Sequence, residues 1–252
     1  MNGMNRVLIG TSWKMHLTWT EAVAWLRAVR PLLDSVDDRD LFVLPPFPAL
    51  EAARRELEGS GIGYGGQDVH AEDQGAHTGD VSAPMLADLG CRYVEVGHSE
   101  RRRDHGETDP IVLAKVRAAL RWDLTPIVCI GEQTRGRIDR ARSVIETQLE
   151  RGLGPLPMAD LERVVLAYEP VWAIGDGAAA ADSGHIEVIH AAIDAWLSAR
   201  GAKVRRLIYG GSVNLANAAD LLAVPRVGGL FVGRAALDPR TFAAIARIAL
   251  PS

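Results

Sequence analysis

The chain alternates between short apolar runs and longer stretches in which apolar residues recur every three or four positions. Runs this short, with few polar residues inside them, predict strands that are buried on both faces, as in a parallel sheet. The longer stretches have the period of helices with one buried face. The eight apolar runs cover residues 7–13, 41–45, 62–67, 93–97, 126–131, 164–169, 207–210 and 229–233.

Helix starts are marked by caps in two places. Thr18 precedes a predicted helix and Glu21 follows three positions later, which is a capping-box pattern. Thr108 stands two positions before Pro110, so a cap is followed by a proline in the first turn. The helices with the clearest apolar face are expected over residues 19–30, 110–122, 186–197 and 241–250.

Eight strand–helix repeats without a break in composition predict one (β/α)8 barrel, which spans residues 1–252 as a single domain. A doubly wound open sheet is the alternative, because the number of apolar runs does not show that the sheet closes. The only loose segment, residues 152–160, holds two glycines and two prolines. It is short enough to join a helix to the next strand.

Polar residues follow most of the predicted strands, at the end where a barrel carries its functional site. They include a carboxylate, an imidazole and an ammonium group, and their convergence at one end favours a functional site over scattered surface residues. Taken singly, each has a plainer interpretation, such as a packed histidine at His98 or a solvated lysine at Lys14. The strand-end residues are Ser12, Lys14, Gln67, Asp68, Glu95, His98, Glu132, Glu169 and Ser212.

The segment around Glu169 is the most informative part of this end. Glu169 closes an apolar strand and is followed by Pro170, which favours an extended backbone before it. Residues 171–174 are too apolar for an ordinary solvated loop, and Gly175 and Gly177 then end any regular element. We expect a lid over a water-excluding site. A buried turn beside a strand-end carboxylate is the alternative.

Two glycine-containing turns offer exposed backbone N–H groups of the kind that bind phosphate. Gly210 and Gly211 precede Ser212, and Gly233 precedes Arg234, whose guanidinium could also meet an anion. Each turn alone is a weak signal. The arginines at 101–103 are either a solvated run or partners of nearby carboxylates.

Composition excludes several functions. Hydrophobic residues make up 48% of the chain and the net charge is −4, so the chain lacks the basic surface of a nucleic-acid-binding protein. Cys91 and Cys129 lie beside or inside apolar runs, which predicts buried, reduced thiols and a cytoplasmic location. The first six residues lack the apolar core of a signal peptide, and no run reaches about 18 apolar residues. We therefore expect neither secretion nor a membrane span.

Several long motifs stand in the order found in triosephosphate isomerases, and the chain resembles that family over essentially its whole length. The motifs are W-K-M at 13–15, T-G-D at 78–80, V-G-H-S-E-R-R at 96–102, G-E-T-D at 106–109, A-Y-E-P-V-W-A-I-G at 167–175, Y-G-G-S-V at 209–213 and F-V-G at 231–233.

The resemblance implies an isomerase that interconverts dihydroxyacetone phosphate and glyceraldehyde 3-phosphate through an enediolate. Glu169 would be the base, His98 the electrophile that polarises the carbonyl oxygen, Lys14 the cation that holds the substrate, and Glu100 an acid close to both. Residues 170–180 would form the lid. No metal or organic cofactor is implied.

The resemblance also implies a phosphate site and a partner. Gly175, Ser212, Gly233 and Arg234 would surround the phosphate of a small sugar phosphate. A homodimer is expected, in which the loop at 74–80 reaches a neighbouring subunit near Thr78. The alternative is that this loop folds back on its own barrel.

Departures from the family pattern bear on the substrate. Ser12 replaces the usual asparagine, Arg234 replaces the second phosphate-binding glycine, Asp176 replaces a common threonine, and alanines at 178–181 replace a lysine hinge. These changes resemble a branch that isomerises the four-carbon L-erythrulose 1-phosphate, so that substrate is the alternative, with Ser12 leaving room near the reacting end.

Two further alternatives come from other classes. A non-catalytic barrel that binds a phosphorylated metabolite would tolerate loss of the base, but Lys14, His98 and Glu169 are all present. An aldolase would need a strand-end lysine for a Schiff base, whereas Lys115 and Lys203 fall on a predicted helix and a connecting segment.

Overall fold

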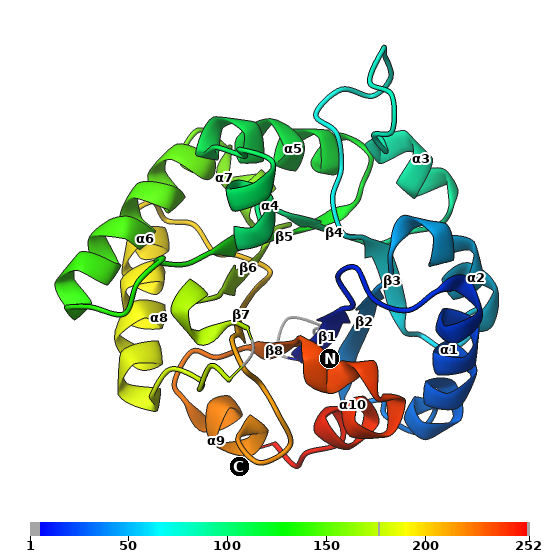
Figure 1. Cartoon of the computed structure of the whole chain (residues 1–252). Coiled ribbons are helices and arrows are strands. Elements are labelled where there is room, and N and C mark those ends of the chain that lie inside the picture. Colours follow the sequence, from blue (N-terminus) through cyan, green and yellow to red (C-terminus); the bar gives the residue numbers. More distant parts are fainter. Residues whose placement is uncertain (1–5, 176, 251–252) are drawn as a thin grey trace.

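The protein is a closed barrel of eight parallel strands in sequence order, with helices around the outside (Figure 1). The computed structural model describes residues 6–175 and 177–250. The predicted (β/α)8 barrel is confirmed, and the doubly wound alternative is wrong, because β1 pairs with β8 as well as with β2. The strands are β1 Val7–Ser12, β2 Arg39–Leu44, β3 Gly63–Gly66, β4 Tyr93–Val96, β5 Thr125–Ile130, β6 Val165–Tyr168, β7 Arg206–Gly210 and β8 Gly229–Val232.

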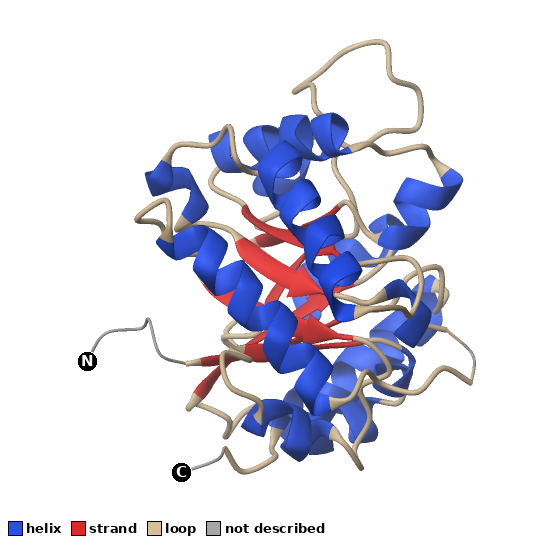
Figure 2. Cartoon of the chain, turned by 90° about the vertical axis from the view of Figure 1, so that its left-hand side faces the viewer, coloured by secondary structure: helices blue, strands red, loops and turns tan. Residues whose placement is uncertain are grey.

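The helices form a layer outside the strands (Figure 2). Short 3-10 turns follow three of the strands: η2 Phe47–Ala49, η3 Val171–Ala173 and η4 Arg234–Leu237. The α-helices are α1 Trp19–Leu33, α2 Leu50–Glu56, α3 Ala83–Asp88, α4 Ser99–Asp104, α5 Asp109–Arg121, α6 Ile138–Gly152, α7 Met158–Leu161, α8 Ser183–Ser198, α9 Ala218–Ala223 and α10 Pro239–Ala246.

The four predicted helices exist, but their ends differ from the predicted ones. α1 begins after the capping box of Thr18, as expected, and continues through Pro31 to Leu33. α8 begins earlier because Asp182 caps it, accepting a hydrogen bond from His185 N. α10 ends at Ala246 instead of residue 250. Thr108 does precede α5, but its side chain makes no capping hydrogen bond, so this part of the prediction is wrong.

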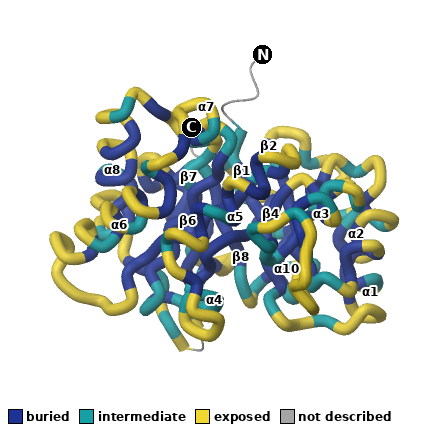
Figure 3. Tube along the Cα trace, turned by 90° about the horizontal axis from the view of Figure 1, so that it is seen from above, coloured by how far each residue is buried: buried dark blue, intermediate teal, exposed yellow. Residues whose placement is uncertain are grey.

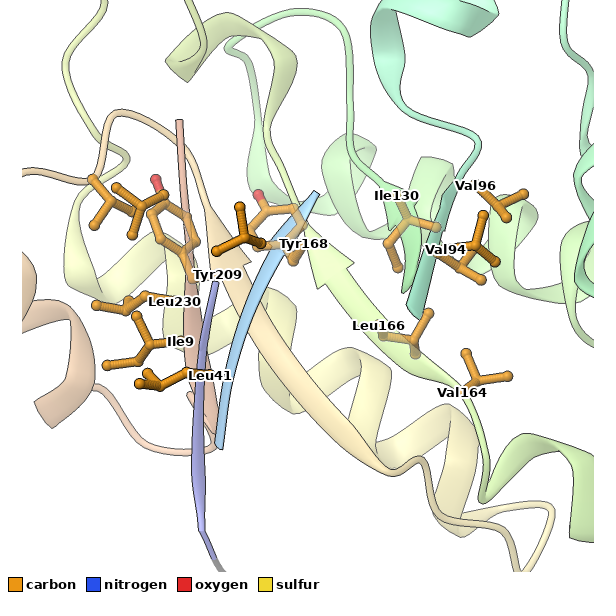
Figure 4. Packing of buried hydrophobic residues seen from close by; sticks show 14 of the residues in the cluster. Ile9, Leu41, Val94, Val96, Ile130, Val164, Leu166, Tyr168, Tyr209 and Leu230 are labelled. Atoms are coloured by element: carbon orange, nitrogen blue, oxygen red, sulfur yellow. The ribbon is translucent and has the colours of Figure 1, made fainter. Parts of the chain in front are cut away.

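Two apolar clusters hold the barrel together. One fills the inside, where large and small residues alternate: a Cβ on Gly10 would lie 2.1 Å from the ring of Phe42, so only glycine fits there. The other lies between strands and helices, and Figure 4 shows part of it, with Tyr168 and Tyr209 on adjacent strands. Both free cysteines, Cys91 and Cys129, are buried as expected.

Burial follows this arrangement. The strands are buried and exposure is concentrated in the helices' outer faces and the loops (Figure 3). Residues 7–12 and 229–232 come from opposite ends of the chain and are paired by β1 and β8. We therefore propose that the chain folds as one domain. Within residues 6–175 and 177–250, no helix is both long enough and apolar enough to cross a membrane.

One loop stands apart from the rest. Between β3 and α3 the chain projects away from the barrel (Figure 1, cyan), and residues 74–80 are all exposed. This is the segment that the sequence assigns to a subunit contact. Within the chain it does not fold back over the barrel, which is at odds with the alternative.

Candidate active site

A cavity of about 500 Å³ opens at the carboxyl ends of the strands. It is lined by all nine residues that the sequence analysis assigned to catalysis or substrate binding. The individual roles of these residues stay predictions. Other strand-end residues lie outside it: Gln67 donates to the backbone oxygens of Leu44 and Lys14, and Asp68 is paired with Lys115. The nine residues are Ser12, Lys14, His98, Glu100, Glu169, Gly175, Ser212, Gly233 and Arg234.

Glu169 is held at the end of β6 with its carboxyl group buried. Its backbone N–H donates to Ile130 O at 2.8 Å, so the barrel fixes its position. Among the described residues, its Oε2 atom has no hydrogen-bond partner. Burial raises the pKa of Glu169 to about 8, and the neighbouring Glu95 adds to the shift. A raised pKa makes this carboxylate a stronger base.

The space for Glu169 depends on a glycine. A Cβ on Gly210 would lie 2.4 Å from Glu169 Oε1, so an alanine there would push the carboxylate aside. We expect Gly210→Ala to lower kcat by about 100-fold, since a displacement of about 1 Å at the reacting atoms has this effect. Gly152→Ala is the matched control, because a Cβ there meets nothing within 4 Å. Equal kcat values for the two variants would contradict this.

His98 faces Glu169 across the cavity. It is the N-cap of α4, and its Nδ1 accepts a hydrogen bond from Glu100 N at 3.2 Å. In a neutral ring the proton must then sit on Nε2, which lies 3.5 Å from Glu169 Oε2. Burial, together with the charge of Lys14, lowers the pKa of His98 to about 4, so the ring is neutral at pH 7. The plainer interpretation of a packed histidine is met on one side of the ring, where Nδ1 contacts the segment at 99–102, but it does not account for Nε2, which faces Glu169.

Lys14 brings positive charge to the same end of the cavity. Its Nζ lies 2.7 Å from Glu100 Oε1, so it does not extend freely into solvent as the plainer interpretation had it. Burial acts to raise the pKa of Glu100, but the hydrogen bond and charge of Lys14 outweigh it and the pKa falls. Lys14 has a φ of 56°, a left-handed conformation that is uncommon for a residue other than glycine, and it lines the cavity.

The segment predicted as a lid is tied to the neighbouring strands. The Ser212 hydroxyl is within hydrogen-bond distance of Ala173 O (2.7 Å) and Ala178 O (2.8 Å), and Tyr209 OH accepts from Ala181 N at 3.0 Å. Trp172 Nε1 donates to Glu132 at 2.7 Å. Asp176 lies outside the described residues. The lid itself stays a prediction, and nothing in the sequence indicated that Tyr209 and Glu132 hold this segment.

The arginines at 101–103 form ion pairs, which confirms the second of the two interpretations. Arg101 pairs with Glu107 at 2.6 Å and Arg102 with Asp109 at 2.7 Å. Lys115 is buried between Asp68 and Glu107, on the helix side and outside the cavity. It therefore cannot serve as a Schiff-base lysine in this cavity.

Known proteins resemble this chain in sequence and in structure. A sequence model of the triosephosphate isomerase family matches residues 7–249. The triosephosphate isomerase of Thermus thermophilus is 46% identical, covering 98% of this chain and 100% of that protein, and the one from Bordetella pertussis is 48% identical, covering 96% of each. The crystal structure of triosephosphate isomerase from Bartonella henselae superposes with a TM-score of 0.84 at 36% identity, covering 95% of this chain and 97% of that one.

The barrel and its cavity define an enzyme of the (β/α)8 class, in which side chains from several strand ends meet over one small substrate. Sequence identity over nearly the full length then narrows the class to one family. The chain belongs to the triosephosphate isomerase family.

Proposed function

We propose that the protein interconverts dihydroxyacetone phosphate and glyceraldehyde 3-phosphate, with Glu169 as the base. The observation that carries this proposal is the juxtaposition of Glu169 Oε2, which lacks a partner among the described residues, with the N–H of a neutral His98 at 3.5 Å. One group can take a proton from carbon while the other donates to the adjacent oxygen. All the relatives named above are triosephosphate isomerases.

The reaction can be followed atom by atom. Glu169 removes a proton from C1 of dihydroxyacetone phosphate, and the electron pair of the C–H bond becomes a C1=C2 double bond. The electrons of the carbonyl bond move to oxygen, where the N–H of His98 and the charge of Lys14 stabilise the enediolate. Glu169 then returns the proton to C2. The proton of the C1 hydroxyl passes to the negatively charged oxygen on C2, and the C1=O bond of the aldehyde forms as the C1=C2 double bond is lost. No electron or atom is gained or lost overall.

The phosphate is expected at the other side of the cavity. Gly175 on the lid, Ser212 after β7 and Gly233 after β8 line that side, together with Arg234. Because the hydroxyl of Ser212 is used on the lid, the phosphate would meet backbone N–H groups and the Arg234 guanidinium. Closure of the lid over it excludes water from the enediolate.

The pH dependence of kcat/KM should report the ionisation of Glu169. Only its carboxylate form can accept a proton, and its pKa is raised to about 8 by burial. We therefore expect kcat/KM to rise with pH through neutrality and to level off above about pH 8–9. His98, with its pKa lowered to about 4, stays neutral over this range. Initial rates from about pH 5 to about pH 10 test this, and a flat profile above about pH 6 would contradict it.

A side-by-side assay decides the substrate. Purified protein is given dihydroxyacetone phosphate and L-erythrulose 1-phosphate, with Glu169→Gln as the blank. A higher kcat/KM for the triose supports the proposal. A higher value for the tetrulose would mean that Ser12 and Arg234 define a longer pocket, and activity on neither would favour a binding protein.

We also propose a homodimer in the cytoplasm. The projecting, fully exposed loop at 74–80 is suited to insert into a neighbour, and the buried free thiols suit a reducing compartment. Thr78→Arg should place a charge in that contact and convert the dimer to monomers, with loss of most activity. Sedimentation velocity measures the change, and Glu72→Arg, outside the loop tip, is the matched control. A monomeric wild-type protein would refute the dimer.

A further inference from the structure

A second carboxylate lies beneath the site and has no role in the mechanism above. Glu95 points inward from β4 and is 3% exposed. Its Oε2 accepts a hydrogen bond from Ser12 Oγ at 2.7 Å, and its Oε1 lies 3.7 Å from the thiol of Cys129. The same thiol also interacts with Glu169. Glu95 is therefore connected to both the lining of the cavity and the base.

This burial is costly for the fold. The carboxyl group stands directly above an apolar layer inside the barrel that includes Tyr93 and Ile127, and burial raises its pKa to about 7. An apolar side chain of similar size would cost less at this position. Of the two hydrogen-bond partners of Glu95, Ser12 lines the cavity and the Cys129 thiol interacts with Glu169. The contacts therefore indicate a functional reason for the carboxylate.

The hydrogen bond determines what Ser12 offers to a substrate. A serine hydroxyl has one hydrogen, and an ionised carboxylate can only accept. When that hydrogen points to Glu95, the hydroxyl oxygen presents lone pairs to the cavity that Ser12 lines. Position 12 then accepts a hydrogen bond and does not donate one.

We propose that Glu95 is a positioning residue for substrate selection, which orients the Ser12 hydroxyl so that its oxygen accepts a hydrogen bond from a hydroxyl group next to the reacting carbonyl. The inference rests on the proposed function, because it assumes that the carbonyl lies beside His98 and Glu169, the end of the cavity where Ser12 stands. The site should therefore favour phosphorylated α-hydroxyketones, such as dihydroxyacetone phosphate, over ketone phosphates that lack this hydroxyl.

A pair of ligands that differ by this one hydroxyl tests the inference. Dihydroxyacetone phosphate carries it, and acetonyl phosphate has hydrogen in its place. Binding of both is measured by calorimetry in the Glu169→Gln background, where turnover is strongly reduced, at about pH 8.5 so that Glu95 is ionised. We expect a preference of about tenfold for dihydroxyacetone phosphate, the size of one neutral hydrogen bond.

Variants at Glu95 and Ser12 show whether these two residues cause the preference for dihydroxyacetone phosphate. Glu95→Leu and Ser12→Ala should each reduce it to about twofold or less, and combining them should reduce it no further, because both remove the same interaction. Glu95→Gln keeps an oxygen that accepts from Ser12 and should retain most of the preference. Glu107→Gln, a buried carboxylate outside the cavity, is the control and should leave the ratio unchanged.

The outcomes separate this inference from the proposed function. A purely structural role for Glu95 would weaken both ligands equally in Glu95→Leu, and an unchanged ratio overturns the inference. If Glu95→Leu fails to fold, Ser12→Ala tests the inference instead. An unchanged preference for dihydroxyacetone phosphate in Ser12→Ala also overturns the inference. The wild-type protein could prefer dihydroxyacetone phosphate, and lose that preference on Glu95→Leu, yet isomerise neither triose phosphate. That result would refute the proposed isomerase activity and still support the role of Glu95.

Discussion

Glu169→Gln should lower kcat for isomerisation by about 10³–10⁴-fold, the contribution of a well-placed general base. The amide cannot accept a proton from carbon, whereas it fills nearly the same volume at the end of β6. Glu169→Asp should lose about 100-fold, because the shorter side chain withdraws the carboxylate by about 1 Å. Both are measured as initial rates with purified protein, and unaltered turnover in both variants would remove Glu169 from its assigned role.

Stability provides the control for this experiment. The folded protein raises the pKa of Glu169 to about 8, above its ordinary value of 4.5, so the folded state favours the protonated form. Ionisation therefore costs stability as the pH rises from about 5 to about 8, and glutamine avoids this cost. The melting temperature of Glu169→Gln relative to wild type should rise over this range. A variant that is much less stable than wild type at every pH would make its low activity uninformative about the base.

Lys14→Met should lower kcat/KM by about 10³-fold. At an effective dielectric constant of about 20, a charge about 4 Å from a substrate anion contributes about 4 kcal/mol. The variant also leaves Glu100 without the Nζ partner that lies 2.7 Å away in the wild type, and a free carboxylate repels an anionic substrate. Steady-state kinetics at low ionic strength and at about 0.5 M salt separate these effects, since salt screens the repulsion.

A double variant separates the loss of the Lys14 charge from the effect of the unpaired Glu100 carboxylate. Lys14→Met with Glu100→Gln removes both charges and should recover part of the lost kcat/KM, so the two effects should not be additive. Glu100→Gln alone frees Lys14 and should have a much smaller effect. If Lys14→Met retains more than a tenth of the wild-type kcat/KM, the cation is not needed to hold the substrate.

The strands and the site could be predicted from sequence because each rests on local chemistry. An apolar run such as residues 164–169 indicates its own burial, and a carboxylate before Pro170 marks the end of a strand. Strand order then places residues such as Lys14, His98 and Glu169 at one rim, whereas Glu100 and Gly175 were expected there only from the resemblance to the triosephosphate isomerase family.

What could not be predicted depends on partners far apart in the chain. The extra turn of α1 beyond residue 30 depends on packing that tolerates Pro31. A lysine at position 115, on an apolar helix face, is not expected from the local sequence. The structure explains it, because Asp68 and Glu107 both pair with its ammonium group. The pairing of Ser12 with Glu95 joins residues 83 positions apart, and nothing in the neighbourhood of either residue announces it.

The closure of the barrel by β1 and β8 also governs when the site can exist during synthesis. Ser12 and Lys14 leave the ribosome before Gly233 and Arg234, which follow about 220 residues later. At about 5–20 residues per second, the first group waits roughly 10–45 s for the second. Until then the parallel strand β1 lacks one neighbour and exposes its backbone groups to other chains. The nascent chain therefore completes the lining of the cavity and loses its open edge in the same late step.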